Sequence, residues 1–370
     1  MEQELLFVGI DVDDQAYHTH LVSKQGTEFN FVCRPNAGIL VKKLKGFKEK
    51  GFTLKVCYEA TYIGFSLQRK LKEAGLECEV IAPSLIPREP GRQVKTDRID
   101  ARKLARYYMQ GMLTSIQVPD EEEETVRDLL RSREFVSKKL SSIKVHILSV
   151  CRRYSLNFRE EVGKPGAHYW TQPHFQWLES KISKIQYPSL KMNLSTLLMI
   201  VRQLESQIDT YDEMITELSN RDRYKKPVKA LCCFRGISTR TAMVLINEIG
   251  DISRFNHPKR LTSFSGMDII EKSSGGTEKK FNITHMGNKY IRTAVVEACQ
   301  TALKPPRISS DLKRRREGAE PKSVEIADRC MQRLNKKGSR LLFAGKQKNK
   351  VTVACGREML GFIWETLRAS

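Results

Sequence analysis

The chain has 370 residues, more than one typical domain needs, with 64 Lys and Arg against 43 Asp and Glu, a formal net charge of +21. Hydrophobic residues make up 40% and aromatic residues 8%, which supplies real cores and excludes a wholly disordered chain. No stretch approaches the roughly 18 uncharged apolar residues that a membrane span needs. So basic a chain points to a polyanionic partner, with nucleic acid as the first candidate.

Residues 1–120 are predicted to form an α/β domain. Its β-rich runs and its helix-periodic segments alternate along the chain. The expected strands are 5–10, 16–23, 29–32, 54–58 and 78–81, and the expected helices are 37–49, 63–74 and 97–112. Three strands in a row, then strands alternating with helices, predict an antiparallel meander that continues into a parallel half-sheet. This order is typical of the RuvC/RNase-H-like layout, although unrelated α/β folds share it.

Residues 121–225 are predicted to be all-α. One long apolar series in this region alternates steps of three and four residues for more than three heptads, which is the signature of a coiled coil. Its members are Leu194, Leu197, Val201, Leu204, Ile208, Tyr211, Ile215 and Leu218. The alternative is an ordinary bundle helix within one domain. Residues 161–190, rich in proline, are expected to form an irregular connection at the end of a long helical hairpin.

Residues 226–370 are predicted to form a third, mainly helical domain. Gly236 lies in a short turn before the apolar helix 241–249, a helix-hairpin-helix-like element whose backbone amides could hold a phosphate. Residues 304–350 contain 15 Lys and Arg against 5 Asp and Glu, densest at 313–316. A run like this is often only a solvated face; in a chain already so basic we expect contacts with backbone phosphates.

The nine cysteines are scattered and form no Cys-x-x-Cys pair, and several lie in apolar runs. They predict reduced, buried thiols rather than a zinc site or a disulfide framework. The first residues are acidic and lead directly into a strand, unlike a secretory signal. We therefore expect a cytoplasmic, nucleoid-associated protein.

Four acids form the first candidate site. Asp11 ends the first predicted strand, Glu59 ends the fourth, and Asp97 and Asp100 share one face at the start of a helix. Adjacent parallel strands bring their carboxyl ends to one edge of a sheet, and converging carboxylates need a hard cation such as Mg²⁺. Each acid alone could be a turn former or a helix cap, and Asp13 is a weaker competitor on the first strand.

A pair of serines forms the second candidate. Ser273 and Ser274 precede two glycines, and Lys272, Lys279 and Lys280 flank them. Such a segment is ordinarily a flexible turn. Glycines would also let a DNA backbone approach a hydroxyl closely, and the lysines could stabilise negative charge on a phosphate.

Together, these motifs resemble the DEDD transposases of the insertion-sequence one-ten family, particularly its eleven-eleven branch, which are RNA-guided serine recombinases related to the pilin-gene invertases. The resemblance covers nearly the whole chain. The acid motifs carrying it are 9–11, 58–61 and 95–105, and the later ones are 236–237, 265–267, 273–276, 285–289 and 357–364. The chain departs from the family where Met267-Asp268-Ile269-Ile270 replaces the usual leucine-x-proline.

The resemblance implies specific roles for the candidate residues. Asp11, Glu59, Asp97 and Asp100 would bind one or two Mg²⁺ ions, with Mn²⁺ as a substitute. Ser274 would be the nucleophile that forms a phosphoserine link to DNA, and Ser273 is the alternative. A structured guide RNA would select donor and target DNA, and the enzyme would act as a homo-oligomer, a dimer or, in the synaptic complex, a tetramer.

Two alternatives of different class stay open at this point. The first is a metal-dependent RuvC-like junction nuclease, in which the serine segment is only a turn and no covalent adduct forms. The second is a non-catalytic nucleic-acid scaffold, whose binding would be indifferent to Mg²⁺.

Overall fold

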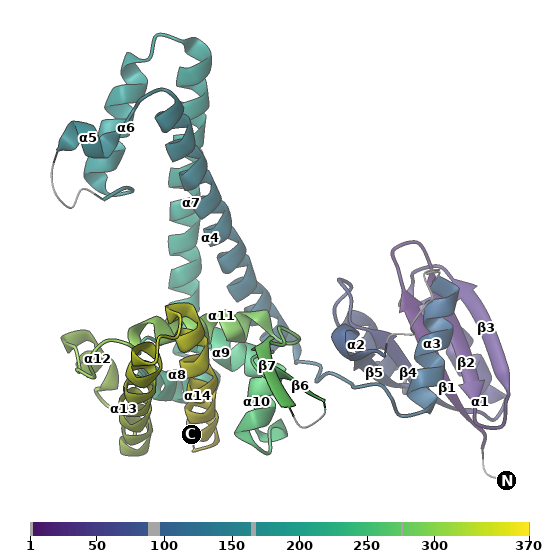
Figure 1. The fold of residues 1–370 in the computed structure, drawn as a ribbon. Helices are drawn as coiled ribbons and strands as arrows, with labels where there is room; N and C mark the ends of the chain where they lie inside the picture. Colours follow the sequence, from purple (N-terminus) through teal and green to yellow (C-terminus); the bar gives the residue numbers. More distant parts are fainter. Residues whose placement is uncertain (1–2, 88–96, 164–167, 275–276, 370) are drawn as a thin grey trace. The chain divides into compact units, whose positions relative to one another are not determined.

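The computed structural model describes residues 3–87, 97–163, 168–274 and 277–369, except for the side chains of residues 97–99 and 272–281. The chain forms two compact units, Met1–Asp120 and Glu121–Ser370 (Figure 1). The predicted boundary between residues 225 and 226 stays a prediction. Among the described residues, no helix combines the length and apolar character that a membrane crossing requires.

The first unit is built on a five-stranded mixed sheet with the strand order β3-β2-β1-β4-β5. Its strands are β1 (Leu5–Val12), β2 (Tyr17–Ser23), β3 (Glu28–Cys33), β4 (Thr53–Glu59) and β5 (Glu77–Ile81). Strands β1, β2 and β3 pair antiparallel, whereas β1–β4 and β4–β5 pair in parallel. The predicted meander and parallel half-sheet are therefore confirmed, strand by strand.

Helices cover both faces of this sheet. They are α1 (Ala37–Glu49), α2 (Ser66–Glu73), the short η1 (Pro83–Leu85) and α3 (Asp97–Met109). Leu6, Val8 and Ile10 of β1 alternate onto one face and pack with Leu40 of α1 and Leu67 of α2. The other face carries α3.

Gly9 permits the close packing of α3 on the sheet. A Cβ atom at Gly9 would lie 2.4 Å from the carbonyl oxygen of Ala101 and 2.4 Å from the amide nitrogen of Ala105. Real Cβ contacts are never so short, so the absence of a side chain at this position sets the distance between α3 and β1.

The second unit is helical apart from one two-stranded hairpin. Its elements are α4 (Glu121–Arg153), α5 (Phe158–Val162), α6 (Gln172–Lys184), α7 (Pro188–Ser219), α8 (Asp222–Cys232), α9 (Thr239–Ile249), η2 (Ile252–Arg254), α10 (Pro258–Phe264), β6 (Ile269–Ser274), β7 (Thr277–Ile283), α11 (Lys289–Ala298), η3 (Cys299–Thr301), α12 (Ser310–Arg316), α13 (Pro321–Phe343) and α14 (Lys348–Ala369).

The long helices α4 and α7 pair with each other to form an antiparallel arm (Figure 1). Leu194 and Val201 of the predicted seam are buried against Leu140 and Ile147 of α4. Ion pairs cross the arm at Arg133–Asp212 (2.7 Å) and Lys144–Glu205 (2.5 Å). The apolar series therefore packs within one chain, as the bundle-helix alternative expects.

Two helices, α5 and α6, close the far end of the arm. Residues 172–184 form a regular helix, so the prediction of an irregular connection over 161–190 was wrong for that segment. His174 lies in an aromatic cluster with Phe158, Tyr169, Trp170 and Trp177. Burial lowers the pKa of His174 to about 4, so this imidazole is neutral and serves the packing.

The remaining helices enclose one large core that extends from α4 to α14. The helix pair α8–α9 forms around the turn at Gly236, as the sequence predicts, and Ser238 is the N-cap of α9. All nine cysteines are buried, as predicted, and none of them is in a disulfide. Burial raises the pKa of Cys78 to about 12 and that of Cys151 to about 11, so neither is a thiolate nucleophile near neutral pH.

We predict that Gly9→Ala loosens α3 from the sheet. The added methyl group overpacks a contact that has no free space, and we expect a loss of about 1–3 kcal/mol in the free energy of unfolding of the first unit. The measurement is hydrogen exchange in the intact chain, read at the amides of α3 and β1.

Gly46→Ala is the matched control. Gly46 lies within α1, and a methyl group at its Cα would have nothing within 4 Å. Alanine there should stabilise the helix by about 0.5–1 kcal/mol. Equal exchange rates at α3 in the parent and in Gly9→Ala would contradict the role assigned to Gly9.

Candidate functional site

Two of the predicted acids occupy neighbouring strand ends in the first unit. Asp11 is the penultimate residue of β1, and Glu59 is the last residue of β4. The parallel register pairs Gly9 with Cys57 and Ile10 with Tyr58, so Asp11 and Glu59 are the next positions along. Both belong to the sheet face of Gly9 and Cys57, which packs against α3.

Helix α3 runs antiparallel to β1 across this face. Phe7 meets Tyr108 edge-to-face at 5.7 Å between ring centroids, and Gly9, two residues on, lies against Ala101 and Ala105. Each step of two residues along β1 thus moves the contact toward the beginning of α3. The next step along the strand sets Asp11 opposite the first turn of α3. Asp97 and Asp100 belong to that turn; Asp100 is half-buried, and the side chain of Asp97 is outside the described part.

The four-acid metal site stays a prediction. Among the side chains that the structure describes, no three acids, histidines or cysteines form a group that could hold a metal ion. That search does not include Asp97. The donor set itself fits the implied ion, because carboxylate oxygens are the ligands that Mg²⁺ and Mn²⁺ prefer.

The competing acid Asp13 lies in the turn between β1 and β2. It is exposed, and its Oδ1 accepts a hydrogen bond from the backbone N–H of Gln15 (2.9 Å). Desolvation raises the pKa of Tyr62, as does its hydrogen bond with Asp14. The loop after β1 therefore meets the loop after β4 here, and Asp13 shapes the turn.

Sequence reasoning missed two histidines on the same face. His18 pairs with Asp11 across β1 and β2, and His20 pairs with Gly9. Buried His20 contacts Glu28 at 2.7 Å, and Arg102 of α3 donates to the same carboxylate at 3.1 Å. Desolvation acts to raise the pKa of Glu28, but the hydrogen bonds from His20 and Arg102 outweigh it and lower the pKa. The alternation of residues 17–23 could have placed both histidines on this face.

The predicted serines lie at the tip of the β6–β7 hairpin in the second unit. Ser274 is the last residue of β6 and pairs with Thr277, and Ser273 pairs with Glu278. The side chains of both serines lie outside the described part of the chain. The choice between them stays open.

Two predicted motifs meet at the base of this hairpin. The backbone N–H of His285 donates to the carbonyl of Gly266 (3.0 Å), and Arg292 donates to the carbonyl of Ser265 (2.7 Å). Gly287 has φ +157°, and a Cβ atom there would lie 2.4 Å from the carbonyl oxygen of Phe264. Residues 265–267 and 285–289 therefore pack together as one rigid base of the hairpin, called the mount below.

A buried carboxylate ties this mount to the arm. Glu248 of α9, only 3% exposed, accepts two hydrogen bonds from Arg131 of α4 at 2.8 and 2.9 Å. It also accepts one from Asn288 at 2.6 Å, while the side chain of Asn288 caps α11. A buried charge is tolerated only when it is paired in this way. No sequence signal distinguished Glu248 from other acids.

Part of the predicted basic cluster is internal. Arg315 donates to the carbonyl oxygens of Cys232 and Ile237, and Arg316 donates to that of Cys233 and pairs with Asp328. These two guanidinium groups hold α12 against the end of α8. Both groups are used within the fold, so the expectation of phosphate contacts was wrong for these two members of the basic cluster.

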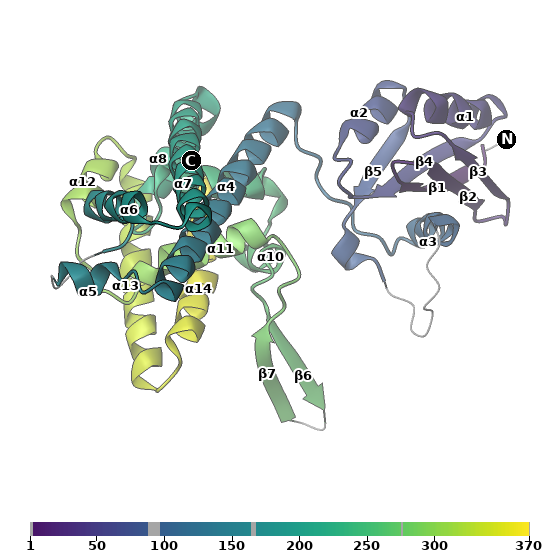
Figure 2. The ribbon, with the colours of Figure 1, turned by 90° about the horizontal axis from the view of Figure 1, so that it is seen from above.

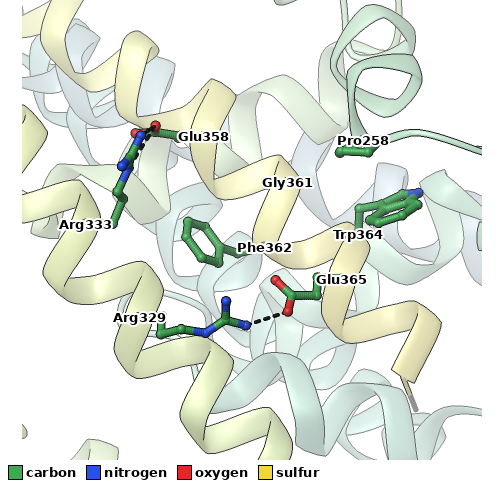
Figure 3. Close-up of a pocket in the computed structure, with 8 residues that line it drawn as sticks. All are labelled: Pro258, Arg329, Arg333, Glu358, Gly361, Phe362, Trp364 and Glu365. Atoms are coloured by element: carbon green, nitrogen blue, oxygen red, sulfur yellow. Dashed lines mark hydrogen bonds and ion pairs between the residues drawn. The ribbon is translucent and has the colours of Figure 1, made fainter.

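A cavity of about 540 Å³ lies between α13 and α14 and contains an aromatic wall, Phe362 and Trp364 (Figure 3). Its two arginines are both neutralised by glutamates of α14, as Arg329–Glu365 and Arg333–Glu358. These ion pairs hold α13 against α14. Because each arginine is neutralised by a glutamate, the lining of the cavity carries little net charge.

Two family models match the chain. Residues 228–313 match a model described as "Transposase IS116/IS110/IS902 family", and residues 8–155 match one described as "Transposase" and named for the DEDD transposases of IS110. The first match begins within α8 and contains α9 and the serine hairpin. The second contains the sheet with its acids.

Several named transposases are similar over long stretches. "Putative transposase y4qE" of Sinorhizobium fredii is 32% identical over 98% of this chain and 88% of its own length. The transposase for insertion sequence element IS1533 of Leptospira borgpetersenii is 28% identical over 90% of this chain and 95% of its own. That for IS1111A of Coxiella burnetii is 22% identical over 65% and 63%. The chain thus belongs to the IS110/IS116/IS902 family of transposases, enzymes that cut and rejoin DNA.

Proposed function

We propose that this transposase moves its element by serine-mediated recombination, assisted by a carboxylate-bound metal ion and guided by a structured RNA. The observation that carries the proposal is the packing of α3 across β1, which directs Asp11, Glu59 and the first turn of α3 toward one corner of the sheet. Of the alternatives, a plain junction nuclease would use the same corner but would leave the serine hairpin without a role.

Asp11, Glu59, Asp97 and Asp100 would hold the divalent ion. When bound, Mg²⁺ supplies Lewis-acid polarisation of a phosphodiester oxygen. The carboxylates would orient the scissile phosphate through their ion, and α3 keeps their geometry because Gly9 and the Glu28–Arg102 pair fix it on the sheet. His18, across from Asp11, is a further polar group at the same corner.

Ser274 would be the nucleophile. Its hydroxyl would attack phosphorus, the bond to one DNA oxygen would break, and the phosphoserine bond would conserve the energy for rejoining. The support is its position at the tip of a hairpin whose base is held by Arg292, Asn288 and Glu248. A well-anchored base limits the loss of orientation that slows such an attack.

A guide RNA would select the donor and target DNA. The support is the net charge of +21, which suits a protein that holds two nucleic acids through their backbones while base pairing carries the sequence information. The family resemblance of the acid and serine motifs points the same way.

The active assembly would be an oligomer in which the acids of one subunit serve the serine of another. The arm offers a surface for association outside its own seam. Met192 and Met199 are one heptad apart on α7 and are 72% and 61% exposed. They would pack against the arm of a second copy.

Asp11→Ala and Asp100→Ala are predicted to abolish strand exchange while RNA binding and folding persist. Each change removes a ligand of the divalent ion, and chelation of Mg²⁺ should have the same effect. The measurement is recombinant product formed in the presence of guide RNA. Asp13→Ala is the matched control, because Asp13 serves the turn; full activity of Asp11→Ala would refute the four-acid site.

Ser274→Ala is predicted to bind RNA and DNA like the parent but to form no covalent adduct and no recombinant. Adjacent positions of a strand belong to opposite faces, so Ser273 replaces Ser274 poorly, and Ser273→Ala should keep at least partial activity. A denaturing gel with labelled DNA measures the adduct. An adduct that survives only in Ser274→Ala would move the nucleophile to Ser273; no adduct from the parent would favour the nuclease alternative.

The oligomer proposal predicts different effects for two pairs of residues on α7, one exposed and one packed inside the arm. Met192→Glu with Met199→Glu should reduce association and leave the helix content unchanged, because both side chains are exposed. Leu204→Glu with Ile208→Glu should instead destabilise the arm, since both side chains are half-buried against its apolar core and full burial of such a side chain contributes roughly 1.5–3 kcal/mol. Sedimentation with and without nucleic acid measures the first effect, and thermal unfolding the second; an unchanged mass of the methionine variant would refute this surface.

A further inference from the structure

The tip of the α13–α14 hairpin combines unpaired positive charge with an exposed aromatic ring. From Asp328 to Glu358 the sequence contains nine Lys and Arg and no Asp or Glu between them. Helix α13 ends at Phe343 and α14 begins at Lys348, so the middle of this acid-free segment is the turn between the two helices. The charge is therefore concentrated at one projecting end of the fold.

The two ends of the hairpin differ in how their cations are used. Toward the base, Arg329 and Arg333 pair with glutamates of α14 (Figure 3), and Lys337 pairs with Glu358 at 3.3 Å. Beyond Lys337 the acids of α14 end. Arg340, Lys346, Lys348 and Lys350 are exposed, and none of them forms an ion pair with another described residue.

An aromatic residue stands among these cations. Phe343 is 97% exposed and its neighbour Leu342 is 39% exposed. A single exposed apolar residue is ordinary on a protein surface. A phenylalanine at the end of a helix, surrounded by four cations and no acid, matches the pairing of stacking platform and phosphate contacts by which proteins hold unpaired bases.

The tip also lies on the side of the second unit that carries the serine hairpin. A second cavity, of about 480 Å³, is lined by Lys337 of α13, Arg357 of α14 and by Asp268, Ile269 and Glu271 at the foot of β6. Figure 2 shows the α13–α14 and β6–β7 hairpins projecting from the same side of the second unit. Phe343 is six residues beyond Lys337, about 9 Å farther along α13.

We propose that this tip, residues 340–350 with Phe343 at its apex, is a DNA-binding element that stacks on an unpaired or unstacked base of the substrate. The four cations contact the flanking phosphates, and the ring occupies the space that the displaced base stack leaves. Transposition requires DNA strands to separate, so the enzyme meets unpaired bases in its substrate. The proposal concerns DNA binding and is independent of which residue is the nucleophile.

The test uses the full-length protein with three 30-base-pair probes of one sequence. These are a fully paired DNA duplex, the same DNA duplex with one unpaired 2-aminopurine, and the RNA duplex with the same bulge. The parent should bind the bulged DNA more tightly than the paired DNA, and stacking should quench the 2-aminopurine fluorescence. Phe343→Ala should weaken binding of the bulged DNA about tenfold, lose the quenching and change binding to the paired duplex less than twofold.

Matched variants separate stacking from folding and from charge. Phe343→Trp should retain affinity and quenching, because it offers a larger ring. Phe135→Ala removes another exposed phenylalanine, on α4, and should behave as the parent. Arg340→Gln with Lys346→Gln should lower the salt dependence of DNA binding by about one unit of slope for each cation, whereas Phe343→Ala should leave the slope unchanged.

Three results would overturn the proposal. Binding and quenching by Phe343→Ala equal to the parent would show that the ring contacts no base. A loss confined to the bulged RNA would assign the tip to RNA. A change in sedimentation of Phe343→Ala with DNA binding intact would assign the tip to contacts between copies of the chain.

Discussion

Repulsion among like charges is the constraint that the rest of this structure satisfies. A chain with 64 cationic and 43 anionic side chains must disperse or neutralise its excess before it can pack. Several arginines are used within the fold: Arg131 pairs with buried Glu248, Arg133 pairs with Asp212, and Arg315 and Arg316 donate to backbone carbonyls. The guanidinium fork suits these sites because it makes several hydrogen bonds at fixed angles. The remaining unpaired cations are concentrated where no acidic side chain lies nearby, as at residues 340–350.

The first unit could be predicted from the sequence because its signals are local. Residues 5–12 alternate between the α1–α2 core and the α3 face, and their nearly continuous apolar run already indicates a strand that is buried on both faces. The parallel pairing of β1 with β4 follows from their order along the chain and from the helix between them. The placement of Asp11 and Glu59 at one edge needed nothing further.

Contacts between residues far apart along the chain could not be predicted from the sequence. The spacing from Leu194 to Leu218 predicts a helix seam correctly but does not identify the partner, which is α4 of the same chain. Strands β6 and β7 were absent from the prediction because Glu271 to Lys280 alternates charges, serines and glycines without an apolar face. Arg315 and Arg316 looked like phosphate ligands because their acceptors, the carbonyls of residues 232–237, lie some 80 positions away. Composition describes how many charges there are, and only folding decides which ones are used internally.

The antiparallel arm has a fixed length. Helix α4 has 33 residues, and its first turns pack in the helical core through Val126 and Leu130. The α5–α6 end therefore stands about 35 Å beyond Leu130, and the Arg133–Asp212 and Lys144–Glu205 bridges keep the two helices from sliding. At 3.4 Å per base pair this span equals about ten base pairs, or roughly one turn of duplex. The far end of the arm is held at that separation from the helical core, and inserting one heptad in each helix would lengthen the interval by about 10 Å, or about three base pairs.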